Sequence, residues 1–164
     1  MKKRNVILLI VFLVTLLLDQ ITKMLASGLP LSQKRVLIPE FFSITYVQNT
    51  GAAWSMLEGK MLFFYFITMI ALVLMILYFR SLREDQMLSK IGVIVMISGT
   101  VGNFVDRLFL GYVRDFLDFI IFGYDFPVFN VADMCLCIGI AFVILDEFIN
   151  DYGVGRIWKK EDLK

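Results

Sequence analysis

The sequence predicts an all-α integral membrane protein with four transmembrane helices and a small extracytoplasmic β-sheet between the first and second helices. Hydrophobic residues make up 59% of the chain and its mean hydropathy is +0.79, whereas a soluble domain is about half apolar. Four apolar segments are each long enough to cross a hydrocarbon core of about 30 Å as a helix. We therefore expect one integral membrane domain, residues 1–164, with spans at about 6–26, 61–79, 88–110 and 129–149.

The first span follows a basic start and stays apolar until Asp19 and Lys23, near its far end. Because these two residues are four apart, they share one face of the helix. A basic start and an apolar core are also typical of a secretory signal peptide, but Asp19 and Lys23 interrupt the region that such a peptide keeps apolar. A plain alternative for the two residues is an ion pair in which Lys23 extends toward the membrane interface.

Residues 27–60 are more polar than the spans, and we expect them to form the extracytoplasmic segment. Residues 42–47 alternate between the two faces with the period of a half-buried strand. The strand leads into Asn49-Thr50-Gly51-Ala52-Ala53-Trp54, whose small residues let the backbone come close to a ligand or another helix. A turn followed by an interfacial Trp54 explains the same residues equally well.

The second and third spans differ in their side chains. Residues 61–79 form an uninterrupted apolar run, which makes this segment the clearest span. Residues 88–110 include several small residues that permit close packing between helices. These small residues are Gly92, Ser98, Gly99 and Gly102.

The third span ends with Asn103, Asp106 and Arg107, which are spaced to share a helix face. A polar face on a membrane helix points toward protein or water and away from lipid. The plain alternative for Asp106 and Arg107 is an ion-pair cluster that only holds helices together.

Residues 111–128 are expected to form an aromatic loop that carries Asp115, and the fourth span begins near Asn130 and Asp133. A carboxylate at the edge of hydrocarbon is costly unless it is paired, hydrated or used in chemistry. Two nearby carboxylates tend to share one proton, so that one acts as a base and the other as an acid. Asp115 and Asp133 therefore predict hydrolysis at the membrane surface, whereas a helix N-cap explains Asn130 and Asp133 alone.

Composition excludes several classes of function. The chain has no histidine, which rules out histidine-based triads and the commonest metal-ligand sets. Cys135 and Cys137 lie two apart in an apolar run, so we expect small core residues and neither a disulfide nor a zinc site. The net charge is +1, with most Lys and Arg at segment ends, which argues against a nucleic-acid partner.

The positions of the charged residues predict the topology. With a helix rise of about 1.5 Å per residue, every unusual polar group falls at one membrane face. Ten Lys and Arg lie in the basic start, the link at residues 80–90 and the C-terminal tail, against six in the opposite segments. This bias places both termini in the cytoplasm and the polar cluster at the extracytoplasmic face.

Five blocks form a pattern across the whole chain. They are Asp19-Gln20-Ile21-Thr22-Lys23, Asn49-Thr50-Gly51-Ala52-Ala53, Gly102-Asn103-Phe104-Val105-Asp106-Arg107, Val113-Arg114-Asp115-Phe116 and Phe129-Asn130-Val131-Ala132-Asp133. In this order, with four spans between them, they resemble the signature motifs of bacterial lipoprotein signal peptidase, also called signal peptidase II. One departure is Arg114, at a position that is usually aliphatic in the family, where we expect an altered pocket rim.

The resemblance implies an aspartic endopeptidase of the bacterial plasma membrane that removes the signal peptide from diacylglyceryl-modified prolipoproteins, cutting just before the lipidated cysteine. It implies Asp115 and Asp133 as the catalytic pair, with no metal and no cofactor. Membrane lipid and globomycin-type cyclic peptides are the other implied partners. The implied substrate-binding or supporting residues are Asp19, Lys23, Asn49, Gly51, Asn103, Asp106, Arg107, Asn130 and Ala132.

Three other functions fit parts of the pattern. A transporter or channel also keeps charges in its spans, but it places some of them near the midplane. A membrane scaffold needs only the ion pairs and has no use for Asp115 and Asp133. A serine/lysine peptidase would use Ser55 and Lys60, but a spacing of five residues is poor helical geometry for that pair.

Overall fold

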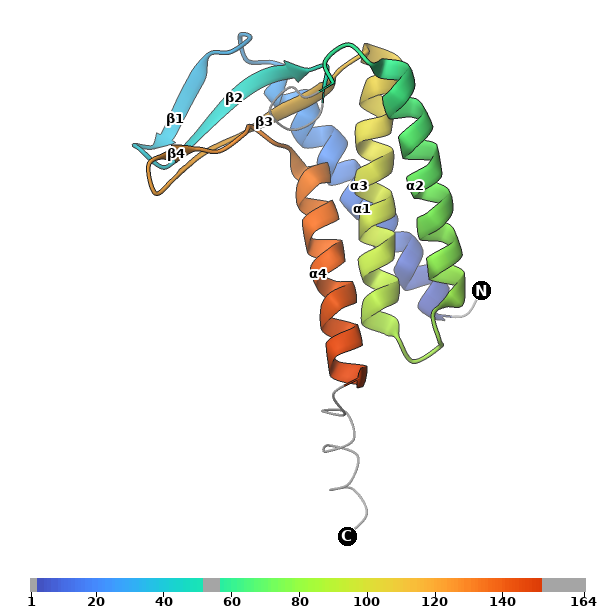
Figure 1. Ribbon diagram of the computed structural model, residues 1–164. Coiled ribbons are helices and arrows are strands. Elements are labelled where there is room, and N and C mark those ends of the chain that lie inside the picture. Colours follow the sequence, from blue (N-terminus) through green and yellow to red (C-terminus); the bar gives the residue numbers. More distant parts are fainter. Residues whose placement is uncertain (1–2, 52–56, 152–164) are drawn as a thin grey trace.

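The computed structural model describes residues 3–51 and 57–151, and in this part of the chain four long helices form a bundle (Figure 1). The helices are α1 (Lys3–Ala26), α2 (Met61–Ser81), α3 (Met87–Leu110) and α4 (Val131–Asp151). Helix α3 contacts each of the other three helices. The bundle is therefore organised around α3, whose polar C-terminal turn lies next to the other helices.

Within the described residues, α1, α2 and α3 are long and apolar enough to cross a membrane. Their outward-facing side chains include Leu17, Leu62 and Phe66, which are exposed, whereas Asp19 and Lys23 are buried. This arrangement suits lipid as the surrounding solvent, because lipid accepts apolar side chains and leaves polar groups to find partners inside the protein. The crossing of the membrane by α4 stays a prediction.

Glycines set the close packing of α3 against α4, as the small residues of the third span predict. A Cβ atom added to Gly92 would lie 2.6 Å from the carbonyl oxygen of Gly139, and one added to Gly99 would collide with the carbonyl oxygen of Ala132. Only glycine lets the two backbones come this close. Near the end of α3, a Cβ on Gly102 would collide with the carboxylate of Asp19.

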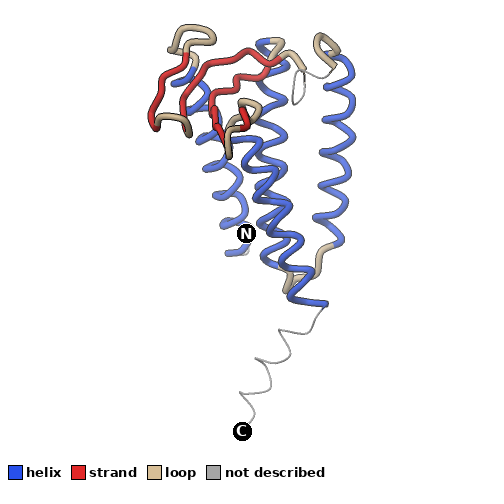
Figure 2. The backbone as a smooth tube through the Cα atoms, turned by 60° about the vertical axis from the view of Figure 1, so that its left-hand side comes forward, coloured by secondary structure: helices blue, strands red, loops and turns tan. Residues whose placement is uncertain are grey.

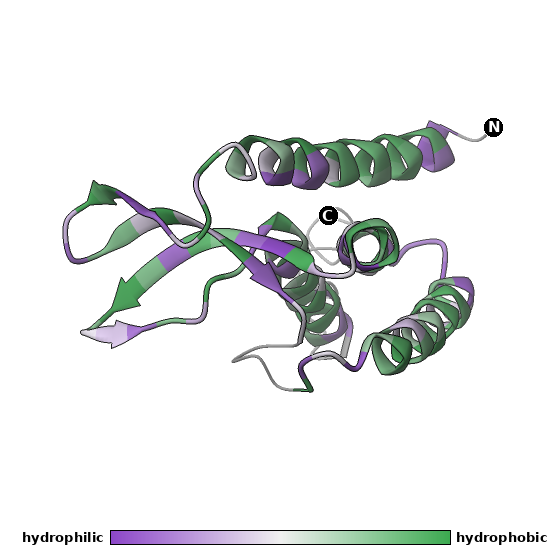
Figure 3. Ribbon diagram, turned by 90° about the horizontal axis from the view of Figure 1, so that it is seen from above, coloured by the Kyte–Doolittle hydropathy of each residue, from purple (hydrophilic) through white to green (hydrophobic). Residues whose placement is uncertain are grey.

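An antiparallel sheet projects from one end of the bundle (Figure 2). Its strands, in spatial order, are β1 (Lys34–Ile38), β2 (Phe42–Asn49), β3 (Val113–Ile121) and β4 (Tyr124–Asp125). Seen from above, the strands carry both hydrophobic and hydrophilic residues, and hydrophilic residues also lie toward both ends of α1 (Figure 3). The prediction of a strand near residues 42–47 is confirmed.

The predicted loop at residues 111–128 is wrong, because half of the sheet comes from this segment. Strand β3 pairs with β2 in a register that sets Val113 opposite Asn49 and Asp115 opposite Val47. Aspartates point to both faces of β3, which hides the alternation of a half-buried strand. Backbone hydrogen bonds between Phe129 and Leu117 extend the pairing, so α4 begins at Val131, two residues later than predicted.

The end of the bundle opposite the sheet has an ion pair and hydrogen bonds between its helices and links. Arg4, near the start of α1, pairs with Glu84 in the α2–α3 link. Asp146 near the end of α4 accepts hydrogen bonds from the backbone N–H and the hydroxyl of Ser89, at 3.1 and 2.6 Å. The start of α1, the α2–α3 link and the end of α4 therefore lie at the same end of the molecule.

Candidate active site

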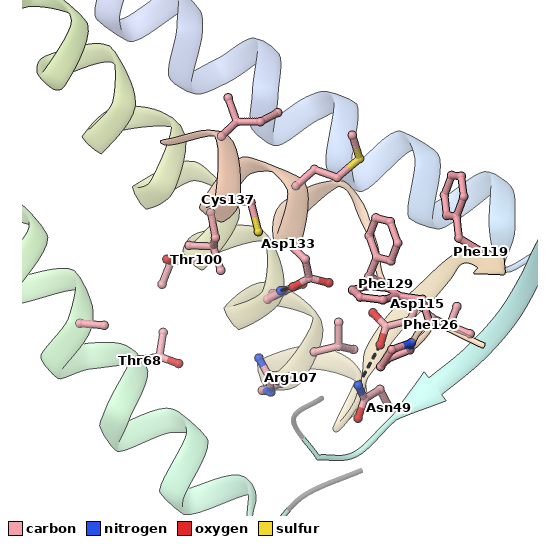
Figure 4. A pocket seen from close by; sticks show the side chains of 18 of the residues that line it. Asn49, Thr68, Thr100, Arg107, Asp115, Phe119, Phe126, Phe129, Asp133 and Cys137 are labelled. Carbon is pink, nitrogen blue, oxygen red and sulfur yellow. Dashed lines mark hydrogen bonds between the residues drawn. The ribbon is translucent and has the colours of Figure 1, made fainter. Parts of the chain in front are cut away.

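A cavity of about 1120 Å³ lies at the sheet end of the bundle, between α2, α3, α4 and β3 (Figure 4). Most of its wall is apolar and includes the aromatic side chains of Phe119, Phe126 and Phe129. Its polar side chains are Asn49, Thr68, Thr100, Asn103, Arg107, Asp115 and Asp133. Both aspartates that the sequence singles out therefore face one cavity.

Asp115 lies on β3 and is only 3% exposed. One carboxylate oxygen accepts a 2.6 Å hydrogen bond from the side-chain amide of Asn130, and the other accepts one of 2.8 Å from Asn49. Burial, and then the nearby charge of Asp133, raises the pKa of Asp115 to about 7, although both amide hydrogen bonds act in the opposite direction. Asp115 therefore holds a proton at a pH where an ordinary aspartate is ionised.

Asp133 lies in the first turn of α4 and shares a capping arrangement with Asn130. The Asp133 carboxylate accepts from the backbone N–H of Asn130, and the Asn130 side-chain oxygen accepts from the backbone N–H of Asp133, both at 3.1 Å. The predicted N-cap is thus confirmed. The other Asp133 oxygen accepts a 2.8 Å hydrogen bond from Asn103. Asn130 therefore contacts both aspartates and joins them in one network.

A buried ion pair from α1 supports this network. The Lys23 ammonium lies 2.9 Å from the Asp19 carboxylate and donates a 2.7 Å hydrogen bond to the side-chain oxygen of Asn103. Asp19 in turn accepts from the backbone N–H of Ala132 at 2.9 Å. The pairing of Asp19 with Lys23 is confirmed, and it fixes α1 to α3 and to the start of α4. The extension of Lys23 toward the membrane interface is wrong, because its side chain is fully buried.

The alternative of an ion-pair cluster is confirmed for Asp106 but not for Arg107, because adjacent residues on a helix point about 100° apart. Arg107 lines the cavity, donates a 3.1 Å hydrogen bond to the carbonyl oxygen of Gly51 and lies 4.7 Å from the centre of the Phe64 ring. Asp106 turns the other way and pairs with Arg114 at 2.6 Å and with Lys23 at 3.6 Å.

The remaining candidate residues differ in where they lie relative to the cavity. Gly51 donates its backbone N–H to the side-chain oxygen of Asn49 at 2.9 Å, so it orients an amide that contacts Asp115. Cys135 is buried, as predicted, but Cys137 is exposed and lines the cavity, so its assignment to the core is wrong. Ala52, Ala53, Trp54 and Ser55 lie outside the described residues.

Sequence reasoning missed several residues around the site. Gln20 donates to the carbonyl oxygen of Gly102 at 3.2 Å and accepts from Arg114 at 3.0 Å. Phe64 packs against Arg107, and Thr68 and Thr100 line the cavity. Polar side chains within apolar spans were the available signal for Gln20 and the two threonines, whereas nothing in the sequence distinguished Phe64 from its neighbours.

Comparisons with known proteins agree with the five motifs. A family model described as Signal peptidase (SPase) II matches residues 11–149. The lipoprotein signal peptidase of Staphylococcus haemolyticus (strain JCSC1435) is 43% identical over 148 residues, which cover 88% of this chain and 94% of that protein. The lipoprotein signal peptidase of Staphylococcus aureus (strain JH9) is 41% identical over 140 residues, which cover 85% of each chain.

Two solved structures of bacterial membrane enzymes, both determined by the in meso method, share the fold. The one at 2.3 Å resolution has a TM-score of 0.77 and 36% sequence identity, and the match covers 87% of this chain and 90% of that chain. The one at 1.9 Å resolution has a TM-score of 0.74 and 37% identity, with coverage of 84% and 90%.

Proposed function

Since this chain belongs to the signal peptidase II family and is a protease that removes the signal peptide from prolipoproteins, we propose that Asp115 and Asp133 carry out the hydrolysis. The observation that carries this proposal is the position of Asn130, which hydrogen-bonds Asp115 through its side chain and Asp133 through its backbone N–H. Both carboxylates also face the same cavity. This arrangement supports the proposal, because the two carboxyl groups of an aspartic protease act on one peptide bond.

The proposed mechanism uses the single proton that the two carboxyl groups share. Asp115, the more buried of the two, carries the proton at rest, because burial and the charge of Asp133 raise its pKa to about 7. Asp133 takes a proton from a water molecule as the water oxygen attacks the scissile carbonyl carbon. Asp115 donates a hydrogen bond to the carbonyl oxygen. As the tetrahedral intermediate collapses and the C–N bond breaks, Asp133 passes the proton that it took from water to the leaving nitrogen.

The supporting residues hold the two carboxyl groups at the required positions. Asn49 and Asn130 donate to Asp115, and Asn103 donates to Asp133. Arg107 donates a hydrogen bond to the carbonyl oxygen of Gly51 and so holds Gly51, which orients Asn49, beside the cavity. Each role is structural in part, because every one of these side chains also joins two elements.

The apolar wall of the cavity suits a lipid-modified peptide, and we assign the substrate as the diacylglyceryl-modified precursor, cut just before its lipidated cysteine. A diacylated cysteine leaves the bilayer only at high cost, since each buried CH₂ contributes about 0.8 kcal/mol. The cavity is lined by both α2 and α4, so the peptide enters sideways while its acyl chains stay in lipid. Globomycin-type cyclic peptides are proposed to occupy the same cavity and to compete with the precursor.

The proposed topology is that of a multi-pass protein of the bacterial plasma membrane, with both termini in the cytoplasm and the cavity near the extracytoplasmic face. The bias of Lys and Arg toward the basic start, the α2–α3 link and the tail supports this orientation. Reporter fusions test it: an enzyme active only in the cytoplasm should work at both termini and fail when it is inserted near residue 40.

The test of the catalytic pair compares purified wild-type protein with Asp115→Asn and Asp133→Asn variants on a lipidated and an unlipidated precursor. Each variant should insert and fold but lose cleavage by at least about 1000-fold, because a neutral amide neither accepts nor shares the proton. Substantial activity in either variant would refute the pair. Equal cleavage of both precursors would refute the assigned substrate.

A further inference from the structure

Arg114 precedes Asp115 on β3, and its side chain points to the opposite face of the strand, away from the cavity. It is therefore not at the pocket rim, where the sequence placed it. Its side chain is 11% exposed. Its guanidinium donates to both oxygens of Asp106, at 2.6 and 3.1 Å, and to Gln20 at 3.0 Å. Its backbone N–H also donates to Asp106, at 3.0 Å.

Arg114 balances a buried cluster of charges. The side chains of Asp106 and Lys23 have no exposed surface, and that of Asp19 is 1% exposed. Two carboxylates thus face two cations, Lys23 and Arg114. An uncompensated charge in such a place is strongly unfavourable. If Arg114 were neutral, the two carboxylates would compete for Lys23 alone.

The position of Lys23 matters to the site because of Asn103. The side-chain oxygen of Asn103 accepts from Lys23 at 2.7 Å and from Asn130 at 3.1 Å. These two bonds orient the Asn103 amide so that its N–H₂ group donates to Asp133. A shift of Lys23 toward Asp106, now 3.6 Å away, would remove one of the two bonds that hold this orientation.

We propose that Arg114 is a positioning residue for the hydrolysis: by neutralising Asp106 it leaves Lys23 on Asn103, and its backbone bond to Asp106 fixes the start of β3 beside Asp115. This role rests on the proposed function of Asp115 and Asp133.

The proposal predicts a change in pH dependence as well as in rate. The charged groups that face the catalytic pair are Lys23 from α1 and Arg107 from α3. Behind Lys23 lie Asp19 from α1, Asp106 from α3 and Arg114 from β3. Loss of the Arg114 charge makes the surroundings more negative, so the shared proton is held more tightly. The pH above which activity declines should therefore move upward.

The experiment measures kcat, KM and the pH profile of purified variants on the lipidated precursor. Arg114→Met should lower kcat about 10- to 100-fold with KM within about twofold, as expected when a group that supports a reactive side chain is removed. Arg114→Lys keeps the charge and should recover part of the rate. The double variant Arg114→Met/Asp106→Asn should have a higher kcat than Arg114→Met alone, because Asp106→Asn removes the unbalanced carboxylate. The exposed Arg35 of β1 provides a matched control, Arg35→Met.

Thermal unfolding of each variant separates a folding defect from a positioning defect. Two results would overturn the proposal: wild-type kcat and pH profile in Arg114→Met, or a lower kcat with an unchanged pH profile that the added Asp106→Asn does not relieve. Neither result tests the assignment of Asp115 and Asp133 as the catalytic pair. Retained activity in Asp115→Asn or Asp133→Asn would instead refute the proposed function, so the two failures are distinguishable.

Discussion

Asn130 contacts both proposed catalytic carboxyl groups through different atoms. Its side-chain N–H₂ donates to Asp115 and Asn103, its side-chain oxygen accepts from the backbone of Asp133, and its own backbone N–H donates back to Asp133. An amide is required because the side chain must donate and accept at once. One residue therefore both caps α4 and holds the two aspartates together.

Asn130→Asp separates these two roles. Aspartate caps a helix about as well as asparagine, so the thermal unfolding temperature should change little. The donor to Asp115 is lost and a third carboxylate enters the site, so kcat should fall by about 100-fold or more. The measurement is cleavage of the lipidated precursor beside a thermal unfolding curve. Wild-type kcat in this variant would show that the bridging amide has no part in the reaction.

The raised pKa of Asp115 predicts how activity depends on pH. At a pH well above about 7, the pair loses its shared proton and the acid that polarises the carbonyl is gone, so kcat should decline. The contribution of the protonated Asp115 carboxyl to the free energy of unfolding changes with pH in the same direction as kcat. It is present below the unfolded-state pKa of about 4 and is lost as pH rises through about 7. A profile of kcat from pH 5 to 9 tests this, and constant activity up to pH 9 would contradict it.

At the scale of the elements, one carboxylate oxygen joins three strands. The Oδ2 atom of Asp118 on β3 accepts from Lys34 of β1 at 3.0 Å and from the hydroxyls of Ser43 and Thr45 on β2, at 3.0 and 2.8 Å. Burial alone would raise the pKa of Asp118, but the Lys34, Thr45 and Ser43 hydrogen bonds together hold it below its usual value. The ionised form therefore stabilises the sheet.

Asp118→Ala should destabilise the sheet by about 2 kcal/mol, because it leaves two buried hydroxyls without their acceptor. In the wild type, the same stabilisation should be lost as pH falls through the lowered pKa of Asp118. Hydrogen exchange of the β1 and β2 amides measures both effects. The control is Glu40→Gln in the exposed β1–β2 turn, and equal exchange rates in the two variants would contradict the prediction.

The contact between α3 and α4 depends on glycine at Gly92 and Gly139. Gly139→Val should push the helices apart and cost about 1–3 kcal/mol, since even a Cβ atom there would collide with the side chain of Met96. The readout is the thermal unfolding temperature in detergent. The control is Leu17→Val on the exposed face of α1, and an equal effect of the two substitutions would show that this packing is not tight.

At the scale of the whole molecule, the proposed site combines parts from every region of the chain. Helix α1 supplies the buried ion pair, β3 supplies Asp115, α3 supplies Asn103, α4 supplies Asp133, and α2 forms the outer wall of the cavity. The polar groups gather at one end of the bundle, which is the placement expected of a surface protease and not of a pathway through the midplane.

Sideways entry predicts that a link between α2 and α4 blocks the reaction. Ala71 on α2 and the native Cys137 on α4 both line the cavity. In an Ala71→Cys variant, a bifunctional maleimide should join the two helices and reduce cleavage of the lipidated precursor by at least about tenfold. The same treatment of Ala71→Cys in a Cys137→Ala background is the control. Full activity of the joined protein would exclude entry between these helices.

The sequence by itself determined the positions of the apolar helices, the strand at residues 42–47, the Asp19–Lys23 pair and the gathering of polar residues at one end. These features depend on hydrophobicity and on spacing along one element, which are properties of neighbouring residues. The motifs also identified Asp115 and Asp133 as the candidate pair, although they lie 18 positions apart in the chain.

Only the tertiary structure decided that residues 113–121 form a strand, that Asp106 pairs with Arg114 in place of Arg107, and that Cys137 faces the cavity. Each of these outcomes depends on partners far away in the chain: β2 supplies the register for β3, and α1 brings Lys23 and Gln20 to Asp106 and Arg114. Such pairings are set by the energy of contacts between elements, and no local pattern of residues encodes them.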